Sequence, residues 1–166
     1  IFVGVMLATL SIQKYRGYNV GMFDIGIMSQ AIWSATQGRP LEFTIYNGQL
    51  SRLGLHVEII YFLISPIYAL FPQPTTLLIL QSLLFAIGAI PVFRITRRHL
   101  KEPRLALALV VIYLFYPVAQ TAVLFDFHGD TLAMPLLLFA LDSLEEHHWK
   151  SYAFFITFAL FSKFYV

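Results

Sequence analysis

Cysteine is absent from this 166-residue chain, and charged residues are scarce. Without cysteine, neither a disulfide framework nor a thiolate metal site can form. Only 12% of the residues are charged and 58% are hydrophobic, whereas about 25% of the residues in an average soluble domain are charged. The net charge of +2 is small, which argues against a nucleic-acid partner. The composition therefore predicts an integral membrane protein whose main partner is the lipid bilayer.

Motifs of soluble cofactor enzymes are missing as well. The chain contains no glycine-rich phosphate loop, no His-Glu-x-x-His metal motif and no Gly-x-Ser-x-Gly nucleophile motif. These absences make an enzyme that depends on a soluble cofactor improbable.

Long apolar runs dominate what remains. A helix needs about 20 apolar residues to cross the hydrocarbon core, and residues 75–93 and 105–124 are predicted spans on that measure. Residues 131–144 form a short run with a proline, which spans only if the bilayer thins. The chain begins and ends inside apolar runs, so residues 1–12 and 151–166 are predicted as partial spans of a longer protein.

The distribution of basic residues predicts which loop faces the cytoplasm. Five Lys or Arg residues and a single Glu lie between residues 94 and 104, and the positive-inside rule places such a loop in the cytoplasm. The span that follows then delivers residues 125–130, FDFHGD, to the extracytoplasmic face. The same topology predicts a solvated cytoplasmic loop for four further residues: Glu145, Glu146, His147 and His148.

The run at residues 55–71 decides where the polar stretch before it lies. It carries His56 and Glu58 at one end and Pro66 inside, so it is short and interrupted for a spanning helix. We favour a juxtamembrane helix, which makes residues 13–74 one extracytoplasmic loop on the same face as FDFHGD. If the run crosses instead, this loop is cytoplasmic and the acidic residues are divided between the two faces.

Within that loop, residues 23–37 are predicted to form an amphipathic helix. Ile25, Met28 and Ile32 share one helical face, and Ser29 lies off it. A helix at the membrane interface is the favoured interpretation, and a short core helix is the alternative.

FDFHGD is the strongest candidate for chemistry. Asp126, His128 and Asp130 would point the same way in an extended segment, so the three together are candidate ligands of a divalent metal ion. Asp130 could instead be the N-cap of a helix that begins at Thr131. Asp126 and His128 have no such simple structural role, although buried neighbours could satisfy them.

Asp24 is the candidate that precedes FDFHGD in the chain. The dipole of the amphipathic helix favours a carboxylate in its first turn, so a structural role is one interpretation. A general base or a metal ligand at the membrane surface is the other. His56 and Glu58 are two residues apart and would face different sides of a helix, and His56 is the stronger candidate of the two.

Three segments together resemble a known family. They are MFDIGIMSQAIWSATQGRPLEF at residues 22–43, the stretch SRLGLHVEII to FRITRRHL at residues 51–100, and FDFHGDTLAMPLLLFAL at residues 125–141. These segments look like the amino-terminal part of a bacterial and archaeal family of predicted multi-pass membrane proteins. That family is similar to the GT-C superfamily of membrane glycosyltransferases, which includes protein mannosyltransferases and aminoarabinose transferases.

The resemblance implies roles for particular residues. Asp24 matches the acidic residue of the first extracytoplasmic loop in GT-C enzymes, and His56 matches the polar residue that opens a juxtamembrane helix. The cluster in the second loop is matched by Asp126, His128 and Asp130. The implied catalytic residues are Asp24, Asp126 and His128. The candidate substrate-binding residues are His56, on this resemblance, with Glu58 near it and Arg52, since arginine suits a phosphate.

The resulting expectation for residues 1–166 is one transmembrane domain. Its fold class is all-α, a polytopic GT-C-like bundle with juxtamembrane helices in the first extracytoplasmic loop. The expected function is glycosyl transfer from a polyprenyl-phosphate sugar in the cytoplasmic membrane of a prokaryote, with a divalent metal ion as a candidate cofactor. The alternative is a non-catalytic subunit or scaffold that packs against other membrane subunits. A transporter is weaker, because no internal repeat is visible.

Overall fold

The computed structural model describes residues 1–45 and 50–162, which are almost entirely helical. The elements in chain order are α1 (Phe2–Arg16), α2 (Met22–Thr36), β1 (Glu42–Phe43), β2 (Leu50–Ser51), the 3-10 turn η1 (Arg52–Gly54), α3 (Ile60–Leu70), α4 (Pro74–Ile87), α5 (Ala89–Leu100), α6 (Pro103–Phe115), α7 (Pro117–Phe125), α8 (Gly129–Glu145) and α9 (Trp149–Ser162). The two short strands pair antiparallel. The prediction of an all-α protein is confirmed.

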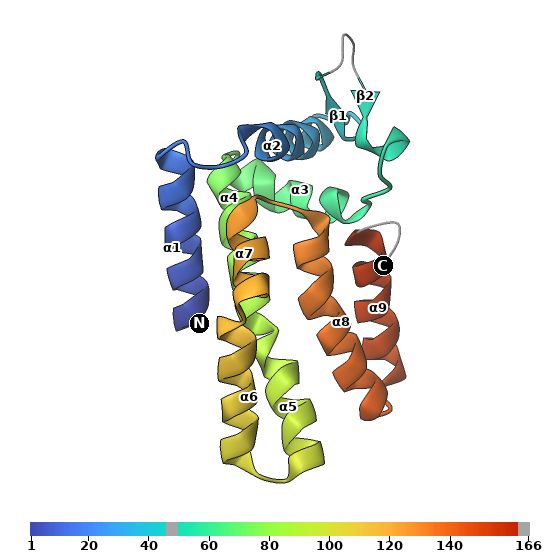
Figure 1. Cartoon of the computed structure of the whole chain (residues 1–166). Coiled ribbons are helices and arrows are strands. Elements are labelled where there is room, and N and C mark those ends of the chain that lie inside the picture. The colour runs from blue at the N-terminus through green and yellow to red at the C-terminus, as the bar shows by residue number, and fades with distance from the viewer. Residues whose placement is uncertain (46–49, 163–166) are drawn as a thin grey trace.

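The helices form an upright bundle with a cap across one end (Figure 1). The bundle consists of α1 and α4 to α9, and the cap consists of α2, α3 and the β1–β2 pair. We call the end under the cap the capped end, and the opposite end, with the α5–α6 turn at residues 101–102, the turn end. The segment between α7 and α8, at residues 126–128, lies at the capped end.

The cap is held by the predicted apolar face of α2. Ile25, Met28 and Ile32 are buried in a core shared with Tyr61 of α3. Ser29 is also buried, so the buried face is wider than periodicity predicted. The α3 helix has 11 residues, and at 1.5 Å per residue it is too short to cross a bilayer.

One continuous helix is long and apolar enough to span a membrane. It runs from Pro74 to Leu100 through α4 and α5 and contains the predicted span 75–93. The predicted span 105–124 is not a single straight helix, because α6 and α7 meet at an angle of 42°. Tyr116 between them is extended, as is usual for a residue before proline. In the part of the chain that the structure describes, one or two helices therefore qualify as spans.

Apolar side chains are exposed along the bundle to a degree that water would not favour. On α6, Leu107, Val111 and Ile112 are each more than half exposed. A contiguous apolar surface of this kind marks contact with lipid or with other proteins.

Candidate active site

A buried glutamine of α4 fixes the segment that carries FDFHGD. Gln81 is 0% exposed. Its Nε2 donates to the backbone carbonyls of Val123 (2.7 Å) and Asp126 (2.8 Å). Its Oε1 accepts from the backbone N–H of His128 (3.2 Å) and from the hydroxyl of Thr131 (2.5 Å). All four hydrogen-bonding positions of the amide are used, so Gln81 determines how this segment passes from α7 to α8.

Asp126 is fully buried in this segment. Its exposed fraction is 0%, and neither carboxylate oxygen accepts a hydrogen bond of normal geometry from the residues that the structure describes. A Cβ on Gly21 would lie 2.6 Å from Oδ2, so a larger residue at position 21 would displace the Asp126 carboxylate. Burial raises the pKa of Asp126, and the negative charge of Asp24 raises it further, while His128, Lys14 and the nearby Gly21 backbone partly oppose this. The protonated form of Asp126 is therefore favoured more than in water.

Asp24 and His128 are the accessible part of the site. Asp24 lies in the first turn of α2, and its side chain is 38% exposed. Its Oδ2 lies 3.8 Å from Nε2 of His128, whose ring stacks on Phe125 at a centroid distance of 5.8 Å. Lys14 extends from α1 and donates to the backbone carbonyl of Leu124. An accessible carboxylate can accept a proton, and the imidazole beside it can stabilise an anion.

An apolar groove leads to this cluster. Its volume is about 560 Å³, and its walls come from α7 and the start of α8. The polar side chains at its rim include His128 and Asp130. A neighbouring hollow of about 450 Å³ follows α8 and is also lined by Asp130. The accessible imidazole therefore lies beside a surface suited to an apolar chain.

Asp130 belongs to a different element from Asp126 and His128. The extended conformation predicted for residues 126–130 ends early, because α8 begins at Gly129 and carries Asp130 into its first turn. His128, not Asp130, occupies the N-cap position. Among residues 1–45 and 50–162, no three His, Asp or Glu side chains converge as they would to hold a metal ion. The predicted metal set of Asp126, His128 and Asp130 is not assembled there.

Sequence comparison identifies the family. A family model described as Predicted membrane protein (DUF2079) matches residues 15–164. The chain belongs to this family. Comparisons with curated proteins and with solved structures gave no match. The recognition of a family of predicted membrane proteins is thereby confirmed.

In this DUF2079 chain, the predicted substrate-binding residues Arg52 and Glu58 form a buried ion pair. They are 7% and 2% exposed. Arg52 donates from Nε to Glu58 Oε2 at 3.0 Å and from Nη2 to the same oxygen. The Tyr61 hydroxyl donates to Glu58 Oε1 at 3.1 Å. Burial, and after it the negative charge of Glu58, raises the pKa of Tyr61 well above the usual value. His56 is exposed on the same loop. Substrate binding by these three predicted residues stays a prediction.

The Arg52–Glu58 pair also packs against the start of α8. A Cβ on Gly129 would lie 3.3 Å from Glu58 Oε1 and 2.1 Å from the carbonyl oxygen of Ser162 in α9. Only glycine permits this approach. The pair therefore joins the cap to the helix that begins directly after His128.

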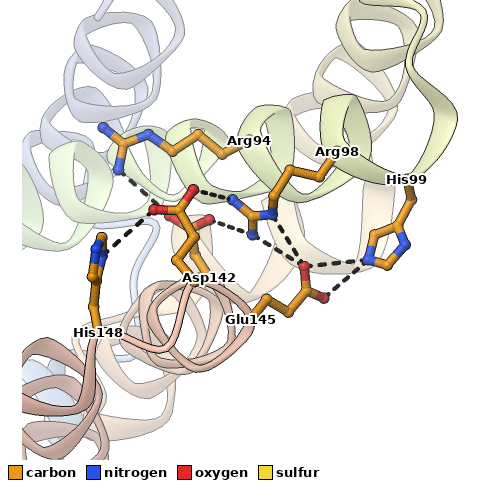
Figure 2. Close-up of polar contacts among 7 residues, drawn as sticks. Arg94, Arg98, His99, Asp142, Glu145 and His148 are labelled. Atoms are coloured by element: carbon orange, nitrogen blue, oxygen red, sulfur yellow. Dashed lines mark hydrogen bonds and ion pairs between the residues drawn. The ribbon is translucent and has the colours of Figure 1, made fainter.

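A second ionic cluster at the turn end was missed by sequence reasoning. Figure 2 shows α5 and α8 joined through Arg98, whose Nη2 lies 2.7 Å from Asp142 Oδ1 and 3.0 Å from Glu145 Oε2. Arg98 Nη1 reaches Glu146 at 2.8 Å, and Arg94 Nη1 lies 3.4 Å from Asp142 Oδ2. The prediction of a solvated loop is wrong for Glu145, which is the last residue of α8 and is half-buried, whereas Glu146 follows the helix and is exposed. The matching one-turn spacing of the basic and acidic residues was the available signal.

Proposed function

We propose that this chain is part of a multi-pass, GT-C-like membrane glycosyltransferase. It would take a polyprenyl-phosphate sugar as donor at the extracytoplasmic face of a prokaryotic cytoplasmic membrane. One observation carries the proposal: Asp24 and His128, separated by about a hundred residues in the chain, meet at 3.8 Å beside the buried Asp126, whose side chain has no hydrogen-bond partner among residues 1–45 and 50–162. A cluster that combines a buried carboxylate, an accessible carboxylate and an imidazole is typical of catalytic sites.

The cluster supplies what glycosyl transfer needs. In the reaction, the bond between the anomeric carbon and the phosphate oxygen breaks, and a bond from that carbon to the acceptor oxygen forms. Asp24, as the accessible carboxylate, takes the proton of the acceptor hydroxyl. His128 in its cationic form offsets the negative charge of the departing phosphate. Asp126 is buried, so we assign it to positioning and local electrostatics.

The surroundings of the cluster support a lipid-linked donor. The groove along α7 is mostly apolar and has His128 in its lining, which suits an isoprenoid chain with its phosphate at the imidazole. Lys14 Nζ uses one donor on Leu124 and keeps others for an anion. Arg52 is committed to Glu58, so it is a weaker candidate for that contact.

Charge distribution supports the proposed side of the membrane. The cations between residues 94 and 104 gather at the turn end. By the positive-inside rule that end faces the cytoplasm, which puts the capped end with Asp24 and His128 outside.

Substitution of Asp24 by Asn in the full-length protein tests the proposal. Expressed in a strain that lacks the native gene, this variant should leave the polyprenyl-phosphate sugar unconsumed, as in the empty strain, when lipid extracts are measured by mass spectrometry. Glu102→Asn, at the turn end, is the control and should restore consumption.

The exposed apolar faces of the bundle favour a second candidate, a scaffold for other membrane subunits. The same experiment separates the two. If Asp24→Asn restores the lipid profile as well as the wild-type chain does, with equal amounts of protein in the membrane, the transferase proposal is wrong.

A further inference from the structure

The basic residues of the turn end divide into two groups. Arg94 and Arg98 pair with α8. Arg97, Lys101 and Arg104 are exposed, and in the described ranges their side chains have no ion pair or hydrogen bond. The acidic residue within this turn is Glu102, whose side chain accepts a hydrogen bond from the backbone N–H of Arg104 at 3.1 Å. Three cations and one carboxylate leave a local charge of +2, so this group is open to an anion.

An apolar groove is lined by α4, α5, α6 and Ile1, and Arg94 and Leu107 are its members nearest in sequence to these cations. Its volume is about 610 Å³, and its lining includes Ile87, Ile90, Phe93, Arg94, Leu107 and Val110. Positions 90, 94 and 97 of α5 are spaced by four and three residues, so they share one helical face. On α6, Arg104 lies one turn from Leu107 of the groove wall. The apolar face of α5 therefore continues directly into the unpaired cations.

The backbone at Lys101 adds a second observation. Lys101 ends α5 with φ 54° and ψ 12°, a left-handed conformation. Glycine is the favoured residue in this position after a helix. A lysine here retains its side chain and charge at the expense of local backbone strain.

We propose that this groove and turn bind one anionic phospholipid. An acyl chain lies along the apolar groove, and the phosphate of the headgroup contacts Arg97, Lys101 and Arg104. Charge complementarity selects the occupant, because a zwitterionic lipid would bring no net charge to the three cations. Arginine pairs with phosphate through two parallel hydrogen bonds, and basic residues at the cytoplasmic membrane surface attract anionic lipids. This site lies at the opposite end from the proposed catalytic cluster and is independent of it.

A reporter tryptophan in the groove measures this binding. The full-length protein with Leu107→Trp, and with every other tryptophan, Trp33 and Trp149 included, replaced by Phe, is placed in phosphatidylcholine vesicles. The vesicles contain a minority of either dibromo-phosphatidylglycerol or dibromo-phosphatidylcholine. Quenching of the reporter fluorescence by the brominated chains is compared between the two lipids. We expect phosphatidylglycerol to be preferred several-fold, since each basic residue near the surface favours an anionic lipid by about fivefold.

Paired variants decide the outcome. Arg97→Gln/Lys101→Gln should bring the preference close to one, whereas Arg16→Gln/Lys150→Gln removes the same charge elsewhere and should leave the preference intact. Lys101→Gly suits the backbone and should weaken the preference in a well-folded protein. No preference in the reporter protein, an unchanged preference in the first variant, or an equal fall in the control would overturn the proposal.

Discussion

Two buried carboxylates lie at opposite ends of the bundle in opposite surroundings. Asp142 at the turn end is 4% exposed and has Arg98 at 2.7 Å and Arg94 at 3.4 Å. Asp126 at the capped end is 0% exposed, accepts no hydrogen bond of normal geometry on its side chain within the described part of the chain, and faces the negative charge of Asp24.

The difference separates a stabilising cluster from a candidate site. A buried carboxylate with arginine partners holds two helices together, and removing a partner is strongly destabilising. A buried carboxylate without such a partner reduces stability, and such a departure from good packing is expected mainly where function requires it. We therefore assign the turn end to stability and lipid contact, and the capped end to chemistry.

The largest expected loss of stability follows from Arg98→Gln. This change leaves the buried Asp142 with Arg94 as its remaining arginine, while Glu145 keeps His99 and Glu146 keeps His148, so the free energy of unfolding should fall by about 3 kcal/mol. Thermal and denaturant unfolding of the detergent-solubilised full-length protein measures it. Arg97→Gln, one residue away and without an ion pair in the described chain, should change stability by less than about 0.5 kcal/mol. Equal effects of the two substitutions would contradict the assignment.

Gln81→Leu should give the next largest effect. It removes four hydrogen bonds from the segment that holds Asp126 and His128, so the free energy of unfolding should fall by about 2 kcal/mol. Transfer activity should fall as well, because the segment no longer holds His128 beside Asp24. Gln13→Leu, at an exposed position of α1, is the matched control and should preserve both. A Gln81 variant with wild-type unfolding would show that the amide does not fix the segment.

Periodicity and charge predicted much of this fold. The face of α2 that contains Ile25 and Ile32 was evident, because burial follows the helical repeat. Gln81 was not evident, because a lone glutamine inside an apolar run gives no sign of partners far along the chain. The break at Tyr116 was missed because the apolar pattern continues through the proline that follows. Asp24 and His128 were both candidates, but only tertiary packing places them 3.8 Å apart.

The smallest expected effects concern pH. Burial raises the pKa of Glu145, but hydrogen bonds from His99 and Arg98 outweigh it, so the pKa is lowered. Its folded pKa is below the unfolded value, so its stabilisation is present at neutral pH and lost as pH falls through the folded pKa. The Asp126 pKa is raised, so its contribution has the opposite sign: stability falls as pH rises from the unfolded pKa through the folded one.

Unfolding midpoints measured across pH test these signs. Glu145→Gln should flatten the acid side of the profile by less than about 1 kcal/mol, because the pair is partly solvated. Asp126→Asn should remove the decline that accompanies rising pH. A profile that keeps both features in the two variants would show that other groups govern the pH dependence.

The most direct test compares Asp126→Asn with Asp142→Asn in the full-length protein. Unfolding temperature is measured in one detergent, and consumption of the polyprenyl-phosphate sugar is measured per folded molecule. We predict that Asp126→Asn unfolds at the wild-type temperature or above it and loses transfer, whereas Asp142→Asn unfolds at a lower temperature and keeps transfer. If Asp126→Asn unfolds earlier with transfer intact, its carboxylate is structural, and the assignment of chemistry to the capped end is wrong.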